Sequence, residues 1–195
     1  MTKFHALACD FYQKPTLDLA QSLLGCLLVK ETPEGICSGY IVETEAYRGP
    51  CDRAAHSFGN RRTKRTEIMF GQSGLVYTYQ MHTHTLVNVV SGGVDKPEAI
   101  LIRAVEPVEG IELMQQRRGL QAGKKLTNGP GKLTKALGIT MQDYGLSYTK
   151  PPIYITPGII PEHISSGPRI GIENSGEAKD YSWRFWITGN SYISK

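Results

Sequence analysis

The stretch Gly39-Tyr40-Ile41-Val42-Glu43-Thr44-Glu45-Ala46-Tyr47-Arg48-Gly49-Pro50 decides how the remainder of the chain is interpreted. It predicts a β-strand that ends at a Gly-Pro turn. Side chains alternate across a strand, so one face should point into the core and the other away from it. The core face would carry Val42, Thr44 and Ala46, and the opposite face Ile41, Glu43, Glu45 and Tyr47. We expect the second face to border a water-filled cleft, because it places two carboxylates beside an aromatic ring.

A carboxylate in this setting is suited to act as a general base. Burial against a ring and the negative charge of Glu43 would both raise the pKa of Glu45 toward the useful range. Arg103 interrupts the otherwise apolar strand predicted at 99–105, and a buried arginine is costly unless it is paired. We therefore expect Arg103 to meet a carboxylate, with Glu45 as a candidate partner. A purely structural ion pair is the alternative.

The chain, residues 1–195, is long enough for one sizeable domain and short for two. Its 21 glycines and 11 prolines predict many turns and short elements. Several predicted strands follow one another over connections too short for the crossovers that parallel strands need. The expected fold class is α+β: a single domain in which a curved, mainly antiparallel, open-barrel-like sheet is flanked by helices and long loops.

Turn residues and apolar periodicity divide the chain into expected elements. Helices are predicted at 16–24, at 106–118, and from Gly129-Pro130-Gly131 to Leu137. Strands are predicted at 26–30, 39–47, 74–81, 86–90, 99–105, 154–156, 168–172 and 183–188. The strands at 86–90 and 99–105 are expected to form a hairpin, and the polar segment 49–69 a long loop.

Composition limits the partners and the location. A net charge of +4 permits a polyanionic partner without requiring one. The four cysteines show neither a C-x-x-C pair nor a zinc-ligand spacing, and no dinucleotide-binding motif or P-loop is present, so no metal or cofactor is expected. No apolar run reaches membrane-spanning length and Met1–His5 opens no signal peptide. We therefore expect a cytoplasmic protein with free thiols and no membrane partner.

Aromatic residues and a histidine are candidates for a binding site. Tyr77 and Tyr79 lie on one face of the strand predicted at 74–81. Such a pair is either a core stripe or a platform for a stacked nucleobase, a contact worth roughly 1–3 kcal/mol per base. His56 follows the carboxylate strand on a loop. It is either a surface residue or a hydrogen-bonding group in the cleft.

Basic residues gather on loops in three places. The groups are Arg61, Arg62, Lys64 and Arg65; Arg117, Arg118, Lys124 and Lys125; and Lys132 with Lys135 beside Gly129-Pro130-Gly131. A glycine-rich turn at a helix N-terminus is suited to bind phosphate. Basic loops around a cleft would also fit a nucleic-acid backbone. Solvated surface charge is the alternative for each group.

An ordered set of segments that spans most of the chain resembles the alkyladenine (3-methyladenine, or methylpurine) DNA glycosylase family. The segments are Ile41–Tyr47, Ala54–Ser57, Met69-Phe70, Gly74–Tyr79, Ile102–Gly110, Gly129–Leu133 and Arg169–Ile172. The resemblance implies a single α+β domain without metal or cofactor. It also implies that the partner is double-stranded DNA containing damaged purines. Nothing in the sequence requires more than a monomer.

The resemblance assigns roles to individual residues. Glu45 would be the general base that activates water for attack on C1′ of a damaged nucleotide. Arg103 and the backbone carbonyl of Ile170 would help to position that water. The pocket for the everted base would be lined by Tyr47, His56, Tyr79 and Asn88, with the two tyrosines on either face of the base and Asn88 excluding purines that carry a normal exocyclic amino group. Independently of the resemblance, we expect supporting or stacking roles for Glu43 and Tyr77. The candidates for phosphate contacts are Arg61, Arg62, Lys64, Arg65 and Lys132.

One departure from the family pattern lies between Tyr79 and Asn88, where the chain is one residue short. The family has a tyrosine here that wedges into the DNA stack. Counting back from Asn88 places the wedge at Met81, and counting forward from Tyr79 places it at His82. We favour Met81, because that register also puts His84 on the usual histidine and because methionine is an acceptable apolar wedge.

The implied reaction is simple hydrolysis. An N-alkylated purine is cationic, so aromatic faces attract it and it leaves readily. No lysine in the motif could form a Schiff base, so an abasic site without strand cleavage is expected. Two alternatives stay open: a hydrolase of free nucleosides or nucleotides, which would not need basic loops or a wedge, and a non-catalytic nucleic-acid-binding module, which would not need Glu45 paired with Arg103.

Overall fold

The computed structural model describes residues 5–121 and 123–194. The expectation about the N-terminal residues therefore lies largely outside the described part. Its three α-helices within these ranges are α1 (Thr16–Ser22), α2 (Ile111–Arg118) and α3 (Pro130–Leu137). Short 3-10 turns occupy part of the long loop predicted at 49–69. The helices at 16–24 and before Gly138 are thus confirmed, the first ending slightly earlier than predicted.

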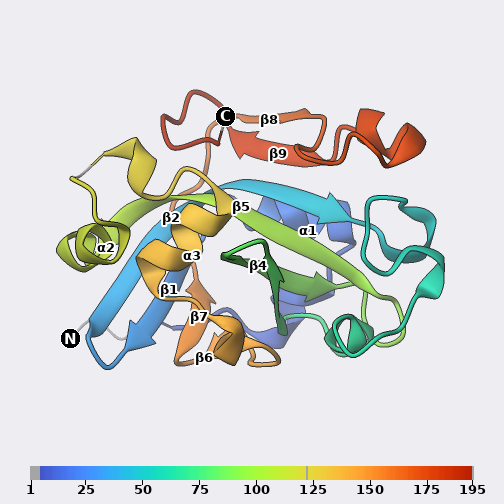
Figure 1. Cartoon of the computed structure of the whole chain (residues 1–195), viewed down its shortest axis with the longest axis horizontal. Coiled ribbons are helices and arrows are strands. Elements are labelled where there is room, and N and C mark those ends of the chain that lie inside the picture. The colour runs from blue at the N-terminus through green and yellow to red at the C-terminus, as the bar shows by residue number, and fades with distance from the viewer. Residues whose placement is uncertain (1–4, 122, 195) are drawn as a thin grey trace.

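The strands form one curled antiparallel sheet (Figure 1). They are β1 (Leu27–Thr32), β2 (Gly35–Tyr47), β3 (Val76–Met81), β4 (His84–Ser91), β5 (Glu98–Glu109), β6 (Thr149–Lys150), β7 (Ile153–Thr156), β8 (Ile164–Gly167) and β9 (Arg184–Ile187). Their main order is β3-β4-β5-β2-β1-β7-β6, and the β8–β9 pair attaches to β2 through β9. The pairing of β4 with β5 confirms the predicted hairpin. The α+β class and the antiparallel sheet are as expected.

Strand β2 is the centre of this arrangement. Its first half pairs with β1, its second half with β9, and β5 accompanies it along most of its length. A bulge leaves Val42 without a partner on β5, between the pairs Ile41–Val105 and Glu43–Ala104. An extra residue shifts the alternation of side chains. Ile41 therefore packs in the main core together with Ala46, and the expectation that it shares a face with Glu43 is wrong.

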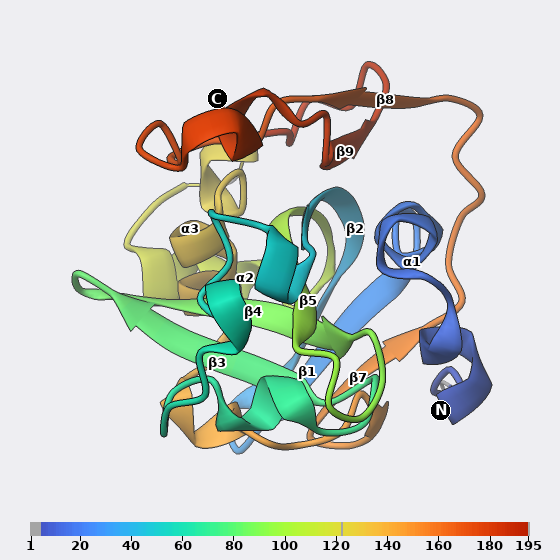
Figure 2. The same cartoon turned by 90° about the vertical axis from the view of Figure 1, so that its right-hand side faces the viewer.

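Helices cover the sheet and fill its concavity (Figure 2). Helix α1 packs on β2, where the Thr44 hydroxyl donates a hydrogen bond of 2.9 Å to the carbonyl of Ala20. Apolar residues of all three helices join strand residues in the main core. A second, smaller cluster gathers residues of β3, β4 and β5 with Met69. This second cluster forms the floor of the site described below.

The helix predicted at 106–118 is confirmed as α2 but begins later, and the strand predicted at 168–172 is wrong. Residues 106–109 belong to β5 and not to the following helix, because a register shift between Ser38 and Gly39 accommodates Pro107 in the sheet; proline in a sheet is confined to such irregular positions. Residues 168–172 form no strand. Strand β8 ends at Gly167, and Gly171 has a left-handed φ of 78° that interrupts an extended chain.

Among the described residues, no helix is long and apolar enough to cross a membrane. Within the same ranges, no group of three or more His, Cys, Asp or Glu side chains is arranged to hold a metal ion.

Candidate active site

The second half of β2 presents two carboxylates that are both fully buried. Glu43 and Glu45 each have a side-chain exposure of 0%. The expectation that this strand face borders a water-filled cleft is therefore wrong for the carboxylates themselves. The register of β2 explains the difference, because β5 and β9 flank both residues. The chain around Ile170 covers Glu45, and the chain around Ser194 covers Glu43.

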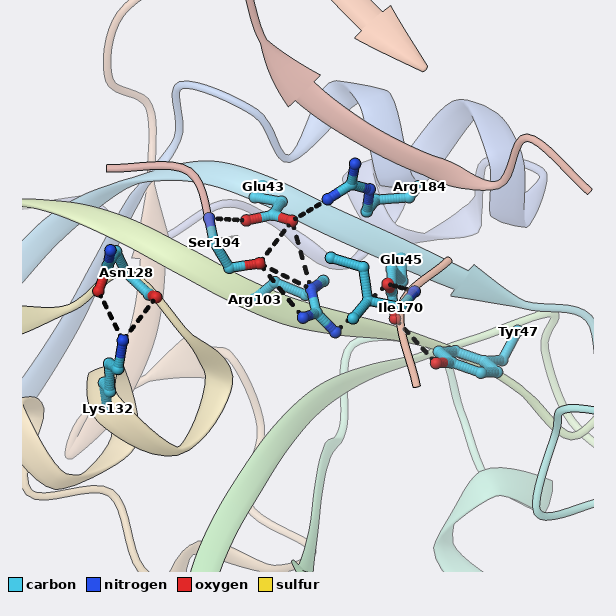
Figure 3. Close-up of polar contacts among 9 residues, drawn as sticks. All are labelled: Glu43, Glu45, Tyr47, Arg103, Asn128, Lys132, Ile170, Arg184 and Ser194. Carbon is cyan, nitrogen blue, oxygen red and sulfur yellow. Dashed lines mark hydrogen bonds and ion pairs between the residues drawn. The ribbon is translucent and has the colours of Figure 1, made fainter. Parts of the chain in front are cut away.

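Glu45 is held by donors from three parts of the chain (Figure 3). The backbone N–H of Ile170 donates to Oε1 at 2.8 Å, and the Tyr47 hydroxyl donates to Oε2 at 2.8 Å. The Nη1 atom of Arg103 lies 3.3 Å from Oε1, which confirms the predicted pairing. A carboxylate offers about four acceptor sites. The donors leave room for one further donor, such as a water molecule.

Burial raises the pKa of Glu45 above its usual range. The charge of Arg103 and the hydrogen bonds from Ile170 and Tyr47 act in the opposite direction, and the charge of Glu43 adds a smaller upward contribution. A raised pKa brings a carboxylate closer to the range in which it accepts a proton efficiently. The sequence-based expectation named both causes, and burial is the larger one.

Glu43 differs from Glu45 in being completely enclosed by donors. Arg103 Nε lies 3.3 Å and Arg184 Nη1 3.1 Å from its Oε1 atom. Ser194 contributes its backbone N–H at 2.6 Å from Oε2 and its hydroxyl at 2.8 Å from Oε1. Two arginines thus balance two carboxylates in one buried cluster, as Figure 3 shows.

A cavity of about 330 Å³ opens beside Glu45. Its wall includes side chains from β2, β3, β4 and β5 and from the loops around them. Residues of the wall include Tyr47, His56, Tyr77, Tyr79, Met81, Asn88, Arg103 and Ile170. Glu45 lies directly behind this wall, since three of its contacts, Tyr47, Arg103 and Ile170, are wall residues. Pockets of this size hold small organic ligands.

The ring of Tyr47 is braced from behind. The Arg169 guanidinium lies 4.7 Å from its centroid and forms a buried two-pronged ion pair with Asp52, at 2.5 and 2.9 Å. Arg169 also fixes the neighbouring Ile170, whose N–H reaches Glu45. Asp52 was not singled out in the sequence, although its position shortly after the carboxylate strand and the general rule that a buried arginine needs a carboxylate could have suggested it.

His56 is neutral and already engaged. Its Nδ1 atom lies 2.8 Å from the Tyr77 hydroxyl, and its Nε2 atom 2.8 Å from Arg65 Nη2. Arginine only donates, so Nε2 accepts and the Nδ1–H donates to Tyr77. Burial, and to a smaller extent the charge of Arg65, lowers the pKa of His56 to about 4. His56 therefore brings no positive charge into the cavity at neutral pH.

Asn88 lies in the cavity wall at the centre of β4. Its Nδ2 atom donates to the Tyr77 carbonyl at 3.0 Å, which fixes the plane of the amide. One amide hydrogen and the carbonyl oxygen are left for a ligand. A rigid polar group in this place is suited to discriminate between ligand edges.

Comparisons with known proteins show which family the chain resembles. The family model for methylpurine-DNA glycosylase (MPG) matches residues 10–191. A protein of Bacillus licheniformis is 69% identical over 97% of this chain and 96% of its own length, and one of Bacillus subtilis is 67% identical over the same shares. Both bear the name "Putative 3-methyladenine DNA glycosylase", as does a protein of Oceanobacillus iheyensis, 56% identical over 98% of this chain and 97% of its own.

The chain belongs to the methylpurine-DNA glycosylase family. It is therefore a DNA glycosylase, a hydrolase that acts on N-glycosyl bonds in DNA.

The hairpin between β3 and β4 contains the segment that the sequence predicts to be one residue short. Met81 pairs with His84, so His82 and Thr83 form a two-residue turn, with His82 at a left-handed φ of 53°. Met81 is 44% exposed and lines the cavity on the same strand face as Tyr77 and Tyr79. His82 is not part of the cavity wall. This placement is consistent with the choice of Met81 over His82.

The basic residues of the glycosylase differ in how free they are. Arg62 is tied to Glu67 by two hydrogen bonds, at 2.6 and 2.9 Å, and lies 3.7 Å from Asp95. Arg65 contacts His56 and lies 4.9 Å from the centroid of the Tyr79 ring. No ion pair involves Arg61 or Lys64 among the described residues.

The other basic groups have structural contacts as well. Lys132 donates to Asn128 Oδ1 at 2.9 Å across the start of α3, as Figure 3 shows. In the second group, Arg117 pairs with Glu34 at 2.6 Å, and Arg118 donates to the Leu126 carbonyl at 3.1 Å. Arg117 and Arg118 therefore stabilise the fold around α2.

Two residues of the buried cluster were not anticipated from the sequence, Arg184 and Ser194. A signal for Arg184 was present, because it stands between Trp183 and Phe185 in an apolar strand and so needs a buried partner. Ser194 carries no such signal, because a serine in an irregular segment is compatible with any environment.

Proposed function

We propose that this glycosylase everts an alkylated or deaminated purine from double-stranded DNA and hydrolyses its N-glycosidic bond with a water activated by Glu45, leaving an abasic site. The observation that carries the proposal is the state of Glu45. It is a fully buried carboxylate with a raised pKa and unused acceptor capacity, directly behind a cavity walled by aromatic rings. The cavity would hold the base, and Glu45 would act on the sugar carbon that follows it.

Several features of the cavity suit an everted purine. A base must leave the stack for chemistry on its glycosidic bond, which costs a few kcal/mol and is cheapest for damaged or mispaired bases. Tyr47 and Tyr79 would receive it between them, and a cationic alkylpurine gains from their faces. His56 is neutral and adds no repulsion. Asn88 would reject the exocyclic amino group of an undamaged purine.

The chemistry requires one proton acceptor. The attacking water would donate a proton to Glu45 while its oxygen bonds to C1′ and the base leaves with the electrons of the glycosidic bond. Arg103, a residue of the cavity wall, and the backbone carbonyl of Ile170 would position that water. The cavity wall, as described, contains no lysine, so the wall offers no amine for a covalent intermediate. Hydrolysis without strand cleavage is the expected outcome.

The DNA backbone would pass over the basic loops around the cavity. Met81, at the exposed end of β3, would fill the gap that the everted base leaves in the stack. Arg61 and Lys64 are the better phosphate contacts, and Arg62, Arg65 and Lys132 would have to exchange protein partners for phosphate. Every proposed site residue comes from one chain, so the proposal needs only a monomer, acting on DNA in the cytoplasm.

A direct assay tests the proposal. The protein is incubated with duplex DNA that carries a single 7-methylguanine, and free base and alkali-labile sites are measured. Release by the wild type that is lost in Glu45→Gln, with DNA binding retained, supports it. Release from free nucleosides alone would favour a nucleoside hydrolase, and binding without release a non-catalytic module. Either result would overturn the proposal.

A further inference from the structure

The segment that follows β9 returns to the sheet and is fastened there. Asn190 Nδ2 donates to Glu106 Oε2 on β5 at 2.7 Å, and Asn190 Oδ1 accepts from the backbone N–H of Tyr192 at 2.9 Å. These contacts bring Ser194 over the middle of β2. Ser194 is buried, with a residue exposure of 7%. Its position in the cluster is seen in Figure 3.

Ser194 connects a carboxylate with an arginine. Its hydroxyl donates to Glu43 Oε1 at 2.8 Å and accepts from Arg103 Nε and Nη2, each at 3.2 Å. A serine hydroxyl has one donor and two acceptor sites, so all of its capacity is used. Its backbone N–H donates to Glu43 Oε2 at 2.6 Å. A side chain with every site occupied is oriented and not simply buried.

These contacts fix the direction in which Arg103 points. A guanidinium is planar, and its N–H groups form a rigid fork. Ser194 holds the edge formed by Nε and Nη2, and Glu43 holds Nε as well. The third nitrogen, Nη1, is left to face Glu45 Oε1 at 3.3 Å. Two points of attachment at one edge therefore determine where the opposite nitrogen lies.

We propose that Ser194 is a positioning residue for base excision, which holds Arg103 in the orientation that serves Glu45 and the cavity. The inference rests on the proposed function. Arg103 lines the cavity and would touch the substrate, whereas Ser194 lies behind it and acts through Arg103 and Glu43. Without the hydroxyl, Arg103 has an alternative arrangement, a closer ion pair with Glu43, which withdraws its charge from Glu45.

The central test is the rate of base release in a single turnover, with enzyme in excess over duplex DNA carrying one 7-methylguanine. Ser194→Ala should slow release roughly tenfold, because a hydrogen bond to a charged group is lost. The affinity for DNA should be unchanged. Ser194→Thr, which restores a hydroxyl, should recover at least part of the rate. Thermal unfolding of each variant establishes that it is folded.

A double-mutant cycle tests the route of the effect. If Ser194 acts through Arg103, then adding Ser194→Ala to Arg103→Ala should cause no further loss of rate. Equal losses with and without Arg103 would overturn the proposal. A wild-type rate in folded Ser194→Ala would also overturn it.

The pH dependence gives a readout that a purely structural role would not move. Arg103 lowers the pKa of Glu45, so withdrawal of its charge should raise that pKa further. The acidic limb of the rate profile of Ser194→Ala should therefore move to higher pH. An unmoved limb contradicts the proposal. Should Ser194→Ala fail to fold, Ser194→Cys, a weaker donor of similar size, should show the same direction of change.

Ser165→Ala is a matched control. Ser165 lies on β8, two strands from Glu43 in the sheet, and shares an exposed hydrogen bond of 2.8 Å with Thr188. Its removal should leave the rate unchanged, and an equal loss there would contradict a specific role for Ser194. The outcomes also separate the two proposals. Activity that needs Glu45 but not Ser194 overturns only the inference, and a wild type without base release overturns both.

Discussion

The region around Glu43 and the region around Glu45 lie two residues apart on β2, yet they are built differently. Both carboxylates are fully buried. Glu43 is enclosed by two arginines, a hydroxyl and a backbone N–H, and of these donors only Arg103 lines the cavity. Glu45 has fewer donors and borders the cavity wall. Burial alone therefore does not distinguish a structural carboxylate from one suited to catalysis.

The number of donors does distinguish them. Glu43 accepts from four donors and holds the groups that carry them in place. Glu45 accepts from three donors and has room for a water molecule, and burial raises its pKa. In this glycosylase the closed region orients Arg103, and Arg103 in turn faces the open one. The comparison predicts that changes at Glu43 act mainly on stability and changes at Glu45 on rate.

The largest effect is expected for Glu45→Gln. Loss of a general base should slow base release by roughly 10³-fold. The thermal unfolding temperature should not fall, because burial disfavours the ionised form of Glu45 and glutamine carries no charge. Single-turnover release and calorimetry on the same preparation measure both quantities. A strongly destabilised but active variant would break the comparison.

Glu43→Ala should lower the free energy of unfolding by about 3–5 kcal/mol, because it leaves buried arginines without their partner. Urea denaturation measures the change. The matched variant is Glu67→Ala, which removes the partner of Arg62 in an exposed pair and should cost far less, because solvent screens such a pair. Equal losses at the two positions would show that the closed cluster is not special.

A smaller effect is expected at the mouth of the cavity. Met81→Ala should weaken productive binding of damaged DNA roughly tenfold, equivalent to about 1.4 kcal/mol, because the apolar group that would fill the vacated stack is lost. His82→Ala should change little, since His82 lies in the turn outside the cavity wall. Titration of single-turnover rates against enzyme concentration compares the two. The reverse ranking would assign the wedge to His82.

The smallest effect is a shift in pH dependence. In the proposed mechanism Glu45 must be ionised to accept a proton, so the rate should fall as pH drops through the pKa of Glu45. The charge of Glu43 contributes to raising that pKa. Glu43→Gln should therefore lower it and move the acidic limb to lower pH, opposite to the shift expected for Ser194→Ala. Rate profiles of folded variants check the sign, and a shift to higher pH would contradict the electrostatic argument.

Local sequence was enough to predict the strand that carries Glu45 and its pairing with Arg103. Period-two patterning and the cost of an unpaired arginine are properties of a few neighbouring residues. The same patterning also placed Tyr77, Tyr79 and Met81 on one strand face, which the cavity wall confirms. Gly138 correctly marked the end of α3, where it takes a left-handed φ of 77°.

Other features depend on contacts that a local pattern does not contain. The bulge at Val42, which sends Ile41 into the core, is set by the register with β5. Pro107 was interpreted as a helix start, although a bulge in the sheet accommodates it equally well. The burial of the carboxylates depends on β9 and on Ser194, which approach β2 from far along the chain. The strand predicted at 168–172 fails for a similar reason. The backbone N–H of Ile170 donates to the distant side chain of Glu45 and not to a neighbouring strand.

The distances in sequence between Glu43 and its partners bear on the order of folding. Arg103 is 60 positions away, Arg184 is 141 and Ser194 is 151. Contacts of such long range pay the entropy of loop closure before they are rewarded, so they form late. Until these contacts form, the carboxylates of β2 stay hydrated and β2 cannot become buried. The cluster around Glu43 and Glu45 should consequently be among the final parts of the molecule to assemble. Recovery of activity during refolding should therefore lag behind recovery of the helical circular-dichroism signal.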